Sequence, residues 1–503
     1  MARDETIGAG YELDLADLAD AVTGGLERLA SDDVVRRIWE RDHTVWKPDP
    51  TEISDRLGWL DLPDRMANEV EDLRAFAAET SEFDRVVLLG MGGSSLAPEV
   101  LSLTFGGRAL TALDTTHPES IKAIEDSGDI SKTLFIVASK SGTTVETLSQ
   151  FAYFFDVVKD GKQFVAITDP GSSLAALGEE YGFRRVFLNP ADIGGRYSAL
   201  SYFGLVPAAL IGTDIAVLLE SAAIMATACR NEDAAENPGA VLGLVIGEAA
   251  KAGRNKLTIF TDKAVASLGT WLEQLIAEST GKEGKGILPV EGEPPGSPAV
   301  YGSDRLFATV GANTDLAPSI SMPLGGSSDL GAEFFRWEFA TAVAGHVLRV
   351  QPFDQPNVQE AKDATNTLLR DGLGDDDTGH LRWLLEEVAP GDYLAILAYL
   401  PRTPTNQQRM QKVRLQLRDR LKVPTTVGFG PRFLHSTGQL HKGGPNTGVF
   451  IQIVDEPSVD VRIPGREYSF RDLLDAQSSG DLRTLRAHGR RVARTSLAKL
   501  EEV

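Results

Sequence analysis

The sequence predicts an α/β protein built from doubly wound parallel sheets. Through much of the chain, short apolar runs alternate with segments that have the spacing of amphipathic helices. Such alternation favours parallel strands joined by right-handed helical crossovers. Two hydroxyl-rich loops, at 92–95 and 139–147, directly follow two of the runs. The carboxyl ends of strands form the ligand crevice in sheets of this type, so the loops point to a binding protein or an enzyme.

The first half of the chain carries the clearest alternation. Its strand candidates are Val86–Gly90, Leu110–Leu113, Thr133–Ser139, Phe164–Thr168 and Arg185–Leu188. Its helix candidates begin at Leu96 and cover Pro118–Asp126, Thr144–Val158 and Ser172–Tyr181. Because these elements strictly alternate, we expect one complete α/β unit here.

A second α/β unit is expected from about Pro238 onward. It has strand candidates at Lys256–Phe260, Tyr393–Leu400 and Val449–Val454, and a helix at Ser267–Glu278. The segments before and after the two units are charged and have helical spacing. We therefore predict a helical N-terminal segment (1–80), a first α/β domain (81–235), a second (236–465) and a C-terminal helical arm (466–503).

Composition excludes several classes of protein. The 503 residues carry a formal net charge of −22, which argues against nucleic-acid or membrane-surface partners. Cys229 is the single cysteine, so the sequence has neither an intramolecular disulfide nor a cysteine-based metal cluster. The first six residues lack an apolar signal core, and no uncharged stretch reaches transmembrane length. These observations predict a cytoplasmic protein.

The loop Ser139-Lys140-Ser141-Gly142-Thr143-Thr144 is the strongest chemical signal. It lies between a strand pattern and a helix pattern, so its hydroxyls and free backbone N–H groups surround a helix N-terminus. This arrangement binds phosphate. A solvated run of helix-capping residues would have the same composition.

Three further loops carry chemistry. In Gly92-Gly93-Ser94-Ser95 the paired glycines allow close backbone approach to a ligand, although a tight turn explains them equally well. Arg196 follows Gly194-Gly195 and could present its guanidinium to an oxyanion. Glu278 ends a helix, where the dipole disfavours its charged form and suits a general base. Glu273, one turn earlier, is interpreted as a solvated residue.

These loops together resemble glucose-6-phosphate isomerase, an enzyme built from two sugar-isomerase (SIS) domains. The matching segments are Gly90–Pro98, Ser139–Thr147, Asp192–Ser198, Glu278–Lys282 and Phe353–Lys362, in the order found in the family. The resemblance is closest to the isomerase domain that some bacteria fuse to transaldolase. It implies two flavodoxin-like α/β/α domains with helical extensions.

The resemblance also assigns site residues. It implies a phosphate cradle at Ser139, Lys140, Ser141 and Thr144, a sugar-contacting turn at Gly93 and Ser94, a catalytic arginine at Arg196 beside Gly195, a carboxylate base at Glu278, a substrate-contacting amide at Gln355 and an active-site lysine at Lys362.

The histidine that opens the sugar ring is less clearly marked. His435 has Gln439-Leu440 at the offset found in the family, so it is our first choice over His441 and His346. In familiar members this histidine precedes the lysine segment, whereas His435 follows Lys362. The second half of the chain is therefore expected to be rearranged.

The resemblance implies an isomerase that interconverts glucose 6-phosphate and fructose 6-phosphate through a cis-enediolate, without metal or cofactor, in glycolysis and gluconeogenesis. Two alternatives stay open: an isomerase that also accepts mannose 6-phosphate, and a non-catalytic sugar-phosphate sensor. The resemblance leaves open a homodimer and a functional link to transaldolase.

Overall fold

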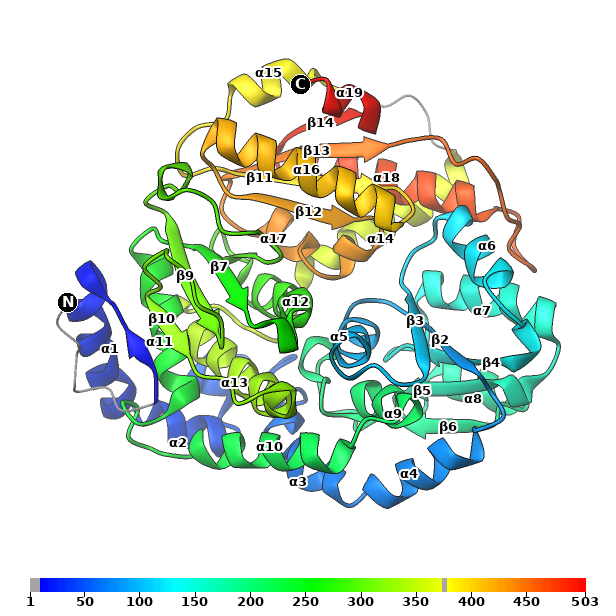
Figure 1. The fold of residues 1–503 in the computed structure, drawn as a ribbon, viewed down its shortest axis with the longest axis horizontal. Coiled ribbons are helices and arrows are strands. Elements are labelled where there is room, and N and C mark those ends of the chain that lie inside the picture. Colours follow the sequence, from blue (N-terminus) through cyan, green and yellow to red (C-terminus); the bar gives the residue numbers. More distant parts are fainter. Residues whose placement is uncertain (1–9, 373–377) are drawn as a thin grey trace.

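The computed structural model describes residues 10–372 and 378–503, which form three α/β lobes around a common centre (Figure 1). Met1–Thr6, on which the prediction of a missing export signal rests, lie outside the described residues. No helix in the described part of the chain is long and apolar enough to cross a membrane.

The first lobe contains a five-stranded parallel sheet. The strand order is β3-β2-β4-β5-β6, and the crossovers are helical. Its elements are β2 (Arg85–Gly90), α5 (Leu96–Phe105), β3 (Ala109–Leu113), α6 (Pro118–Asp126), β4 (Thr133–Ala138), α7 (Val145–Val158), β5 (Phe164–Thr168), α8 (Ser173–Glu180), β6 (Arg185–Leu188) and α9 (Tyr202–Ile211). Every residue of β4 and β5 is buried, as expected for central parallel strands covered on both faces.

The second lobe carries the sheet β1-β10-β9-β7-β8, in which only β1 is antiparallel. Its elements are β1 (Glu12–Leu13), α10 (Ile215–Ala228), α11 (Pro238–Lys251), β7 (Lys256–Thr261), α12 (Leu268–Thr280), β8 (Leu288–Val290), β9 (Arg305–Val310), β10 (Ile320–Met322) and α13 (Leu330–Leu348). The N-terminal helices α1 (Ala19–Ser31), α2 (Val34–Trp39), α3 (Leu62–Ala67) and α4 (Val70–Glu79) share one hydrophobic core with this lobe and with the first sheet.

The third lobe has the parallel sheet β12-β11-β13-β14. Its elements are α14 (Pro356–Asp371), α15 (Leu381–Glu386), β11 (Tyr393–Tyr399), α16 (Pro404–Leu421), β12 (Thr425–Phe429), α17 (Gly438–Gly443), β13 (Gly448–Val454), α18 (Phe470–Ala487), β14 (Arg491–Thr495) and α19 (Leu497–Glu501). Phe470 and Leu473 of α18 pack into the core of the first lobe, so the C-terminal region ties the two lobes together.

The α/β fold with parallel sheets and flanking helices is therefore confirmed. The strands of 236–465, which we expected to form one domain, are distributed between the second and third sheets. The expectation of a purely helical arm over 466–503 is wrong at Arg491–Thr495, which forms the edge strand β14. An edge strand accommodates these charged residues because Arg491 pairs with Asp392 and Arg494 donates to Gln452.

Candidate active site

The hydroxyl-rich loop between β4 and α7 folds around the N-terminus of the 14-residue helix α7. The Oγ atom of Ser139 lies 2.9 Å from Thr144 Oγ1 and accepts a hydrogen bond from the Gly142 backbone N–H at 3.1 Å. Ser141 Oγ lies 2.9 Å from Thr143 Oγ1. Gly142 has a φ of +71°, a left-handed conformation that favours glycine. The loop thus gathers four hydroxyls at a positive helix end, as a phosphate site requires.

Lys140 is already held by an anion. Its ammonium group pairs with Asp169, which follows β5, and also donates to the Ala191 carbonyl at 3.1 Å. Burial raises the pKa of the Asp169 carboxyl, although the Lys140 charge opposes that shift. A phosphate bound at this loop would therefore share Lys140 with Asp169.

The short 3₁₀ turn η4 (Gly92–Ser94) lies where several of the predicted site segments meet. It contacts η7 (Gly195–Tyr197), η11 (Arg432–His435) and α12. A Cβ atom on Gly93 would lie 2.1 Å from the Gly195 carbonyl oxygen, and one on Gly92 would lie 2.8 Å from the His435 oxygen. The two glycines thus let three loops pack together, a reason that differs from the close ligand approach expected from the sequence.

Arg196 is buried and uses its whole guanidinium fork. Its Nε donates to Ser279 Oγ at 2.8 Å, and its Nη1 donates to Gln355 Oε1 at 2.9 Å. Its Nη2 donates to the carbonyls of Pro352 and Asp354, at 2.7 and 2.8 Å. These hydrogen bonds hold the cation rigidly in one orientation, as a preorganised oxyanion partner requires.

Glu278 lies beside this arginine, near the C-terminal end of α12, as the sequence predicts. Its Oε2 is 3.5 Å from Arg196 Nη1 and accepts a hydrogen bond of 2.9 Å from Gln274 Nε2. Only 7% of Glu278 is exposed. One carboxylate is thus held between a cation and an amide in a largely dry environment, where a general base can be oriented.

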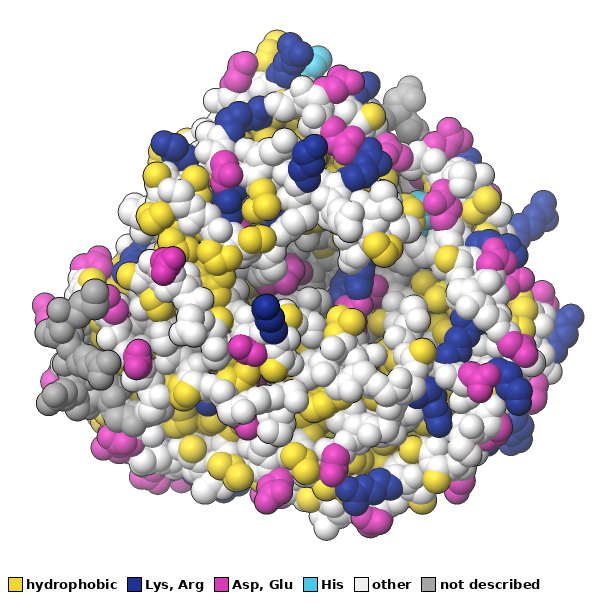
Figure 2. Space-filling model, in the orientation of Figure 1, with side chains coloured by type: hydrophobic (Ala, Val, Ile, Leu, Met, Phe, Trp, Pro, Cys, Tyr) yellow, Lys and Arg dark blue, Asp and Glu magenta, His cyan; other side chains and the backbone are white. Residues whose placement is uncertain are grey.

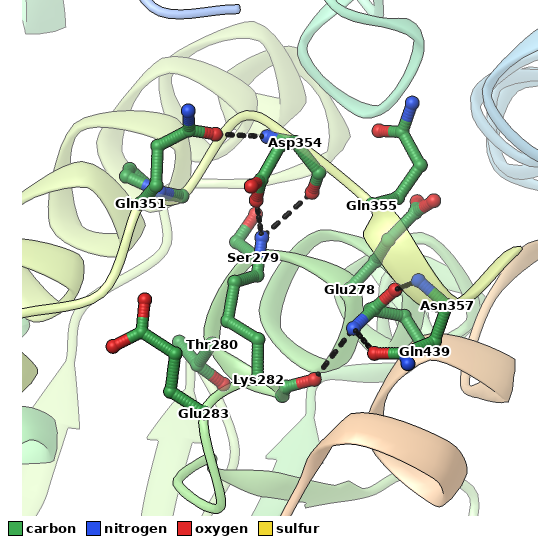
Figure 3. Close-up of polar contacts among 12 residues, drawn as sticks. Glu278, Ser279, Thr280, Lys282, Glu283, Gln351, Asp354, Gln355, Asn357 and Gln439 are labelled. Carbon is green, nitrogen blue, oxygen red and sulfur yellow. Dashed lines mark hydrogen bonds and ion pairs between the residues drawn. The ribbon is translucent and has the colours of Figure 1, made fainter. Parts of the chain in front are cut away.

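A second buried cation lies behind this pair. Figure 3 shows Lys282 reaching toward Asp354, with its Nζ atom 2.5 Å from Asp354 Oδ1 and 2.6 Å from the Asp354 carbonyl oxygen. Burial lowers the pKa of Lys282 to about 8, Arg196 adds to this decrease, and Asp354 opposes it. Lys282 and Arg196 therefore hold the same carbonyl and fix the segment that carries Gln355.

The histidine and the predicted lysine face another wall of the site. His435 Nε2 lies 2.9 Å from Glu146 Oε1, which also accepts a hydrogen bond of 2.8 Å from Gln477 Nε2. Burial alone would raise the pKa of Glu146, but the adjacent His435 and the more distant Lys362 hold that pKa below its ordinary value. His435, Glu146 and the exposed Lys362 line one cavity of about 260 Å³, together with Thr144 of the phosphate loop.

The two competing histidines lie elsewhere. His441 is buried among Tyr393, Phe433 and Phe450, and neither ring nitrogen has a hydrogen-bond partner within the described residues. Burial lowers its pKa well below the ordinary value, so the ring is neutral. His346 Nδ1 lies 2.7 Å from the Val45 carbonyl oxygen, beneath the N-terminal helices. The geometry favours His435.

Sequence reasoning missed several polar partners. Glu146 lies inside the segment Ser139–Thr147, but its partner His435 is on another lobe. Gln274 is one helical turn before Glu278, a spacing that could have identified it. Glu273 is not simply solvated: Ser436 Oγ donates to it at 2.9 Å, and burial together with Glu291 raises its pKa to about 7.

The chain is similar in sequence to known proteins. Residues 60–288 match the family model "Phosphoglucose isomerase". The glucose-6-phosphate isomerase of Carboxydothermus hydrogenoformans is 34% identical over 249 residues, which cover 45% of this chain and 53% of that protein. A probable glucose-6-phosphate isomerase of Haloarcula marismortui is 25% identical over 424 residues, which cover 72% and 95%. The chain spans about half the length of several such relatives, including the first named here.

Two solved structures share the fold. A hypothetical protein from Thermus thermophilus has a TM-score of 0.61 at 24% identity, with coverage of 73% of this chain and 100% of that one. A glucose-6-phosphate isomerase from Chlamydia trachomatis has a TM-score of 0.59 at 16% identity, with coverage of 76% and 93%.

Proposed function

Because the chain is related to the phosphoglucose isomerase family, we propose that it interconverts glucose 6-phosphate and fructose 6-phosphate. The observation that carries this proposal is that η4 contacts η7, α12 and η11, which bear Arg196, Glu278 and His435 of two polar pairs. One pair is Glu278 with Arg196, and the other is His435 with Glu146. A proton-transfer base beside a cation, with a second acid–base pair within the same site, suits aldose–ketose isomerisation.

The phosphate of the substrate would bind at the hydroxyls of Ser139, Ser141 and Thr144, with Lys140 as the nearest cation. His435 and Lys362 line the cavity that adjoins this loop, which supports their role in opening the sugar ring. His435 would protonate the ring oxygen while the anomeric hydroxyl loses its proton, so that the C1–O5 bond breaks and the C1 carbonyl forms. Glu146 would hold the imidazole in place through the 2.9 Å contact with its Nε2.

Glu278 would then remove the C2 proton of the open aldose. The electron pair forms the C1–C2 double bond, and the negative charge moves to the C1 oxygen, where Arg196 would stabilise it. Return of the proton to C1, with transfer of the O2 hydroxyl proton to O1, completes the ketose. Gln274 and Arg196 both contact Oε2 of this carboxylate and would orient it along this short path.

The test is to give the purified chain fructose 6-phosphate in EDTA and to follow glucose 6-phosphate with a coupled dehydrogenase. Turnover is expected without added metal or cofactor. Binding of the sugar phosphate without turnover would replace the enzyme by a sensor. Turnover of mannose 6-phosphate in the same assay would broaden the proposal to a dual-specificity isomerase.

The cellular setting belongs to the same proposal. A cytoplasmic enzyme of glycolysis and gluconeogenesis is expected from the substrate and from the relatives' names. A homodimer stays open, and light scattering measures the oligomeric state. A functional link to transaldolase would be tested by co-purification.

A further inference from the structure

His435 is carried by the short turn η11, which spans Arg432–His435. In a 3₁₀ helix, residues three apart lie on the same face. Arg432 and His435 are three apart, and both side chains reach carboxylates of the first lobe. The turn therefore attaches to that lobe at two points, first through Arg432 and second through His435.

The first attachment is a buried group of two arginines and two acids. Arg432 Nη1 lies 2.5 Å from Asp114 Oδ2, and its Nη2 lies 2.5 Å from Glu99 Oε2. Arg402, which follows β11, also pairs with Glu99. Arg432 is 9% exposed and Asp114 is 5% exposed. The formal charges cancel, which is what such a buried group needs to be stable.

The charge states of Glu99 and Arg432 depend on burial and on the partners that oppose its effect. Burial would raise the pKa of Glu99, but Arg432 and Arg402 hold it at about 2. Burial would lower the pKa of Arg432, but Asp114 and Glu99 raise it above the ordinary value. The contact between Arg432 and Glu99 is therefore ionic at neutral pH.

The acceptors belong to the part of the first lobe that carries the site loops. Glu99 is on α5, which begins two residues after η4, and Asp114 directly follows β3. Ser95 Oγ donates to Asp114 Oδ2 at 3.1 Å, so the Gly-Gly-Ser-Ser loop shares the acceptor. Figure 2 shows a hollow at the centre of this face with basic and acidic side chains at its floor. Two cavities of about 510 and 560 Å³ are both lined by Glu99, Arg402 and Arg432.

From this geometry we propose that Arg432 is a positioning residue, which docks η11 on Glu99 and Asp114 and thereby sets His435 against Glu146. The inference rests on the proposed function for its catalytic consequence. Phe433 packs the turn on Tyr399 and His441 of the third lobe, while Ser436 Oγ on Glu273 and Gly92 under the His435 backbone hold the following end; Arg432 supplies the ion pairs to the first lobe. Without Arg432, the first end of the turn would be free to move away from the first lobe.

The main test compares R432M with wild type in two measurements. Turnover of fructose 6-phosphate is expected to fall roughly 10²-fold, the contribution of a positioned acid–base group. Affinity for arabinonate 5-phosphate, an acyclic analogue of the enediolate that needs no ring opening, is expected to stay within about 2-fold. Turnover close to that of wild type would overturn the proposal, as would an equal loss of turnover and affinity in protein that is fully folded.

Two further variants control for stability. R402M removes the other arginine of the same group without touching η11, and is expected to retain turnover. R432K keeps the charge but presents a single ammonium that cannot bridge two carboxylates as a guanidinium does. It is expected to fold and to lose turnover roughly 10-fold, less than R432M. Wild-type turnover in R432K would contradict the bridging role.

A spectroscopic measurement separates this inference from the proposed activity. The ring-proton NMR signal of His435, assigned by its absence in H435N, is expected to shift in R432M and R432K but not in R402M. An unchanged signal in R432K would overturn the positioning role even if wild-type protein turned over no sugar phosphate. A shifted signal together with inactive wild type would reject the proposed function alone.

Discussion

His435 Nε2 and Glu146 Oε1 are 2.9 Å apart, although 289 positions separate the two residues in the chain. Glu146 is the second residue of α7, so the carboxylate that holds the histidine and the loop that would hold phosphate belong to one helix N-terminus. Negative charge is favourable at that end of a helix. One rigid element would therefore couple the proposed phosphate site to the orientation of His435.

Replacing Glu146 with glutamine is expected to lower turnover of fructose 6-phosphate roughly 10²-fold, since the carboxylate that orients the imidazole of His435 is lost. Affinity for arabinonate 5-phosphate is expected to change little. The matched control is E125Q, because Glu125 accepts hydrogen bonds from Tyr153 and Lys122 of the same lobe, away from the site. Equal activity of E146Q and E125Q would contradict the role of Glu146.

Replacing Glu278 with glutamine is expected to lower turnover by about 10²–10⁴-fold, because an amide cannot accept the C2 proton. Exchange of that proton with deuterium oxide, followed by NMR, is expected to slow equally. E283Q is the control, since Glu283 is exposed and pairs with Lys47. Proton exchange at the wild-type rate in E278Q would assign the base to another residue.

Removal of Lys140 tests the phosphate cradle. K140M is expected to raise KM roughly 10- to 100-fold, because a charge-assisted hydrogen bond is lost and Asp169 is left facing the phosphate. In the double variant K140M/D169N that repulsion is absent, so KM is expected to fall part of the way back. A double variant no better than K140M would show that Asp169 does not act on the substrate.

Lys282 predicts a pH dependence of stability. Its pKa is about 8 in the folded protein, below the ordinary 10.5, because burial disfavours the charged form. The charged form therefore destabilises the fold fully below pH 8, by roughly 3 kcal/mol, and this cost is lost as pH rises toward 10.5. Urea unfolding across this range is expected to show the rise in wild type and in K285M, but not in K282M. The same slope in K282M would assign it to another group.

The first lobe could be predicted almost to the residue. Its central strands are buried on both faces and read as continuous apolar runs, of which Phe164–Thr168 coincides with β5. In the other lobes β8, β9, β10, β12 and β14 were not predicted, and for β12 and β14 the reason is physical. Both are at or near sheet edges, where Gly428 and Arg491 interrupt the apolar pattern because fewer positions need to be buried.

The site could be predicted where its residues belong to one loop, and not where they meet across lobes. The end of α12 at Thr280 confirms the expected helical position of Glu278. By contrast, the docking of Arg432 on Asp114 joins positions 318 apart, and no local pattern records such a contact. The mistaken reading of Glu273 has the same origin, because its partner Ser436 is on another lobe.

Gln439 and Asn357 hold each other through two hydrogen bonds: Gln439 Oε1 accepts from the Asn357 backbone N–H, and Gln439 Nε2 donates to Asn357 Oδ1. These two hydrogen bonds join the start of α14, the helix that carries Lys362, to α17, which follows His435 in the chain. The two helices are far apart in the sequence. The same contact would form whichever of the two helices came first along the chain, because it depends only on groups that meet in the folded protein.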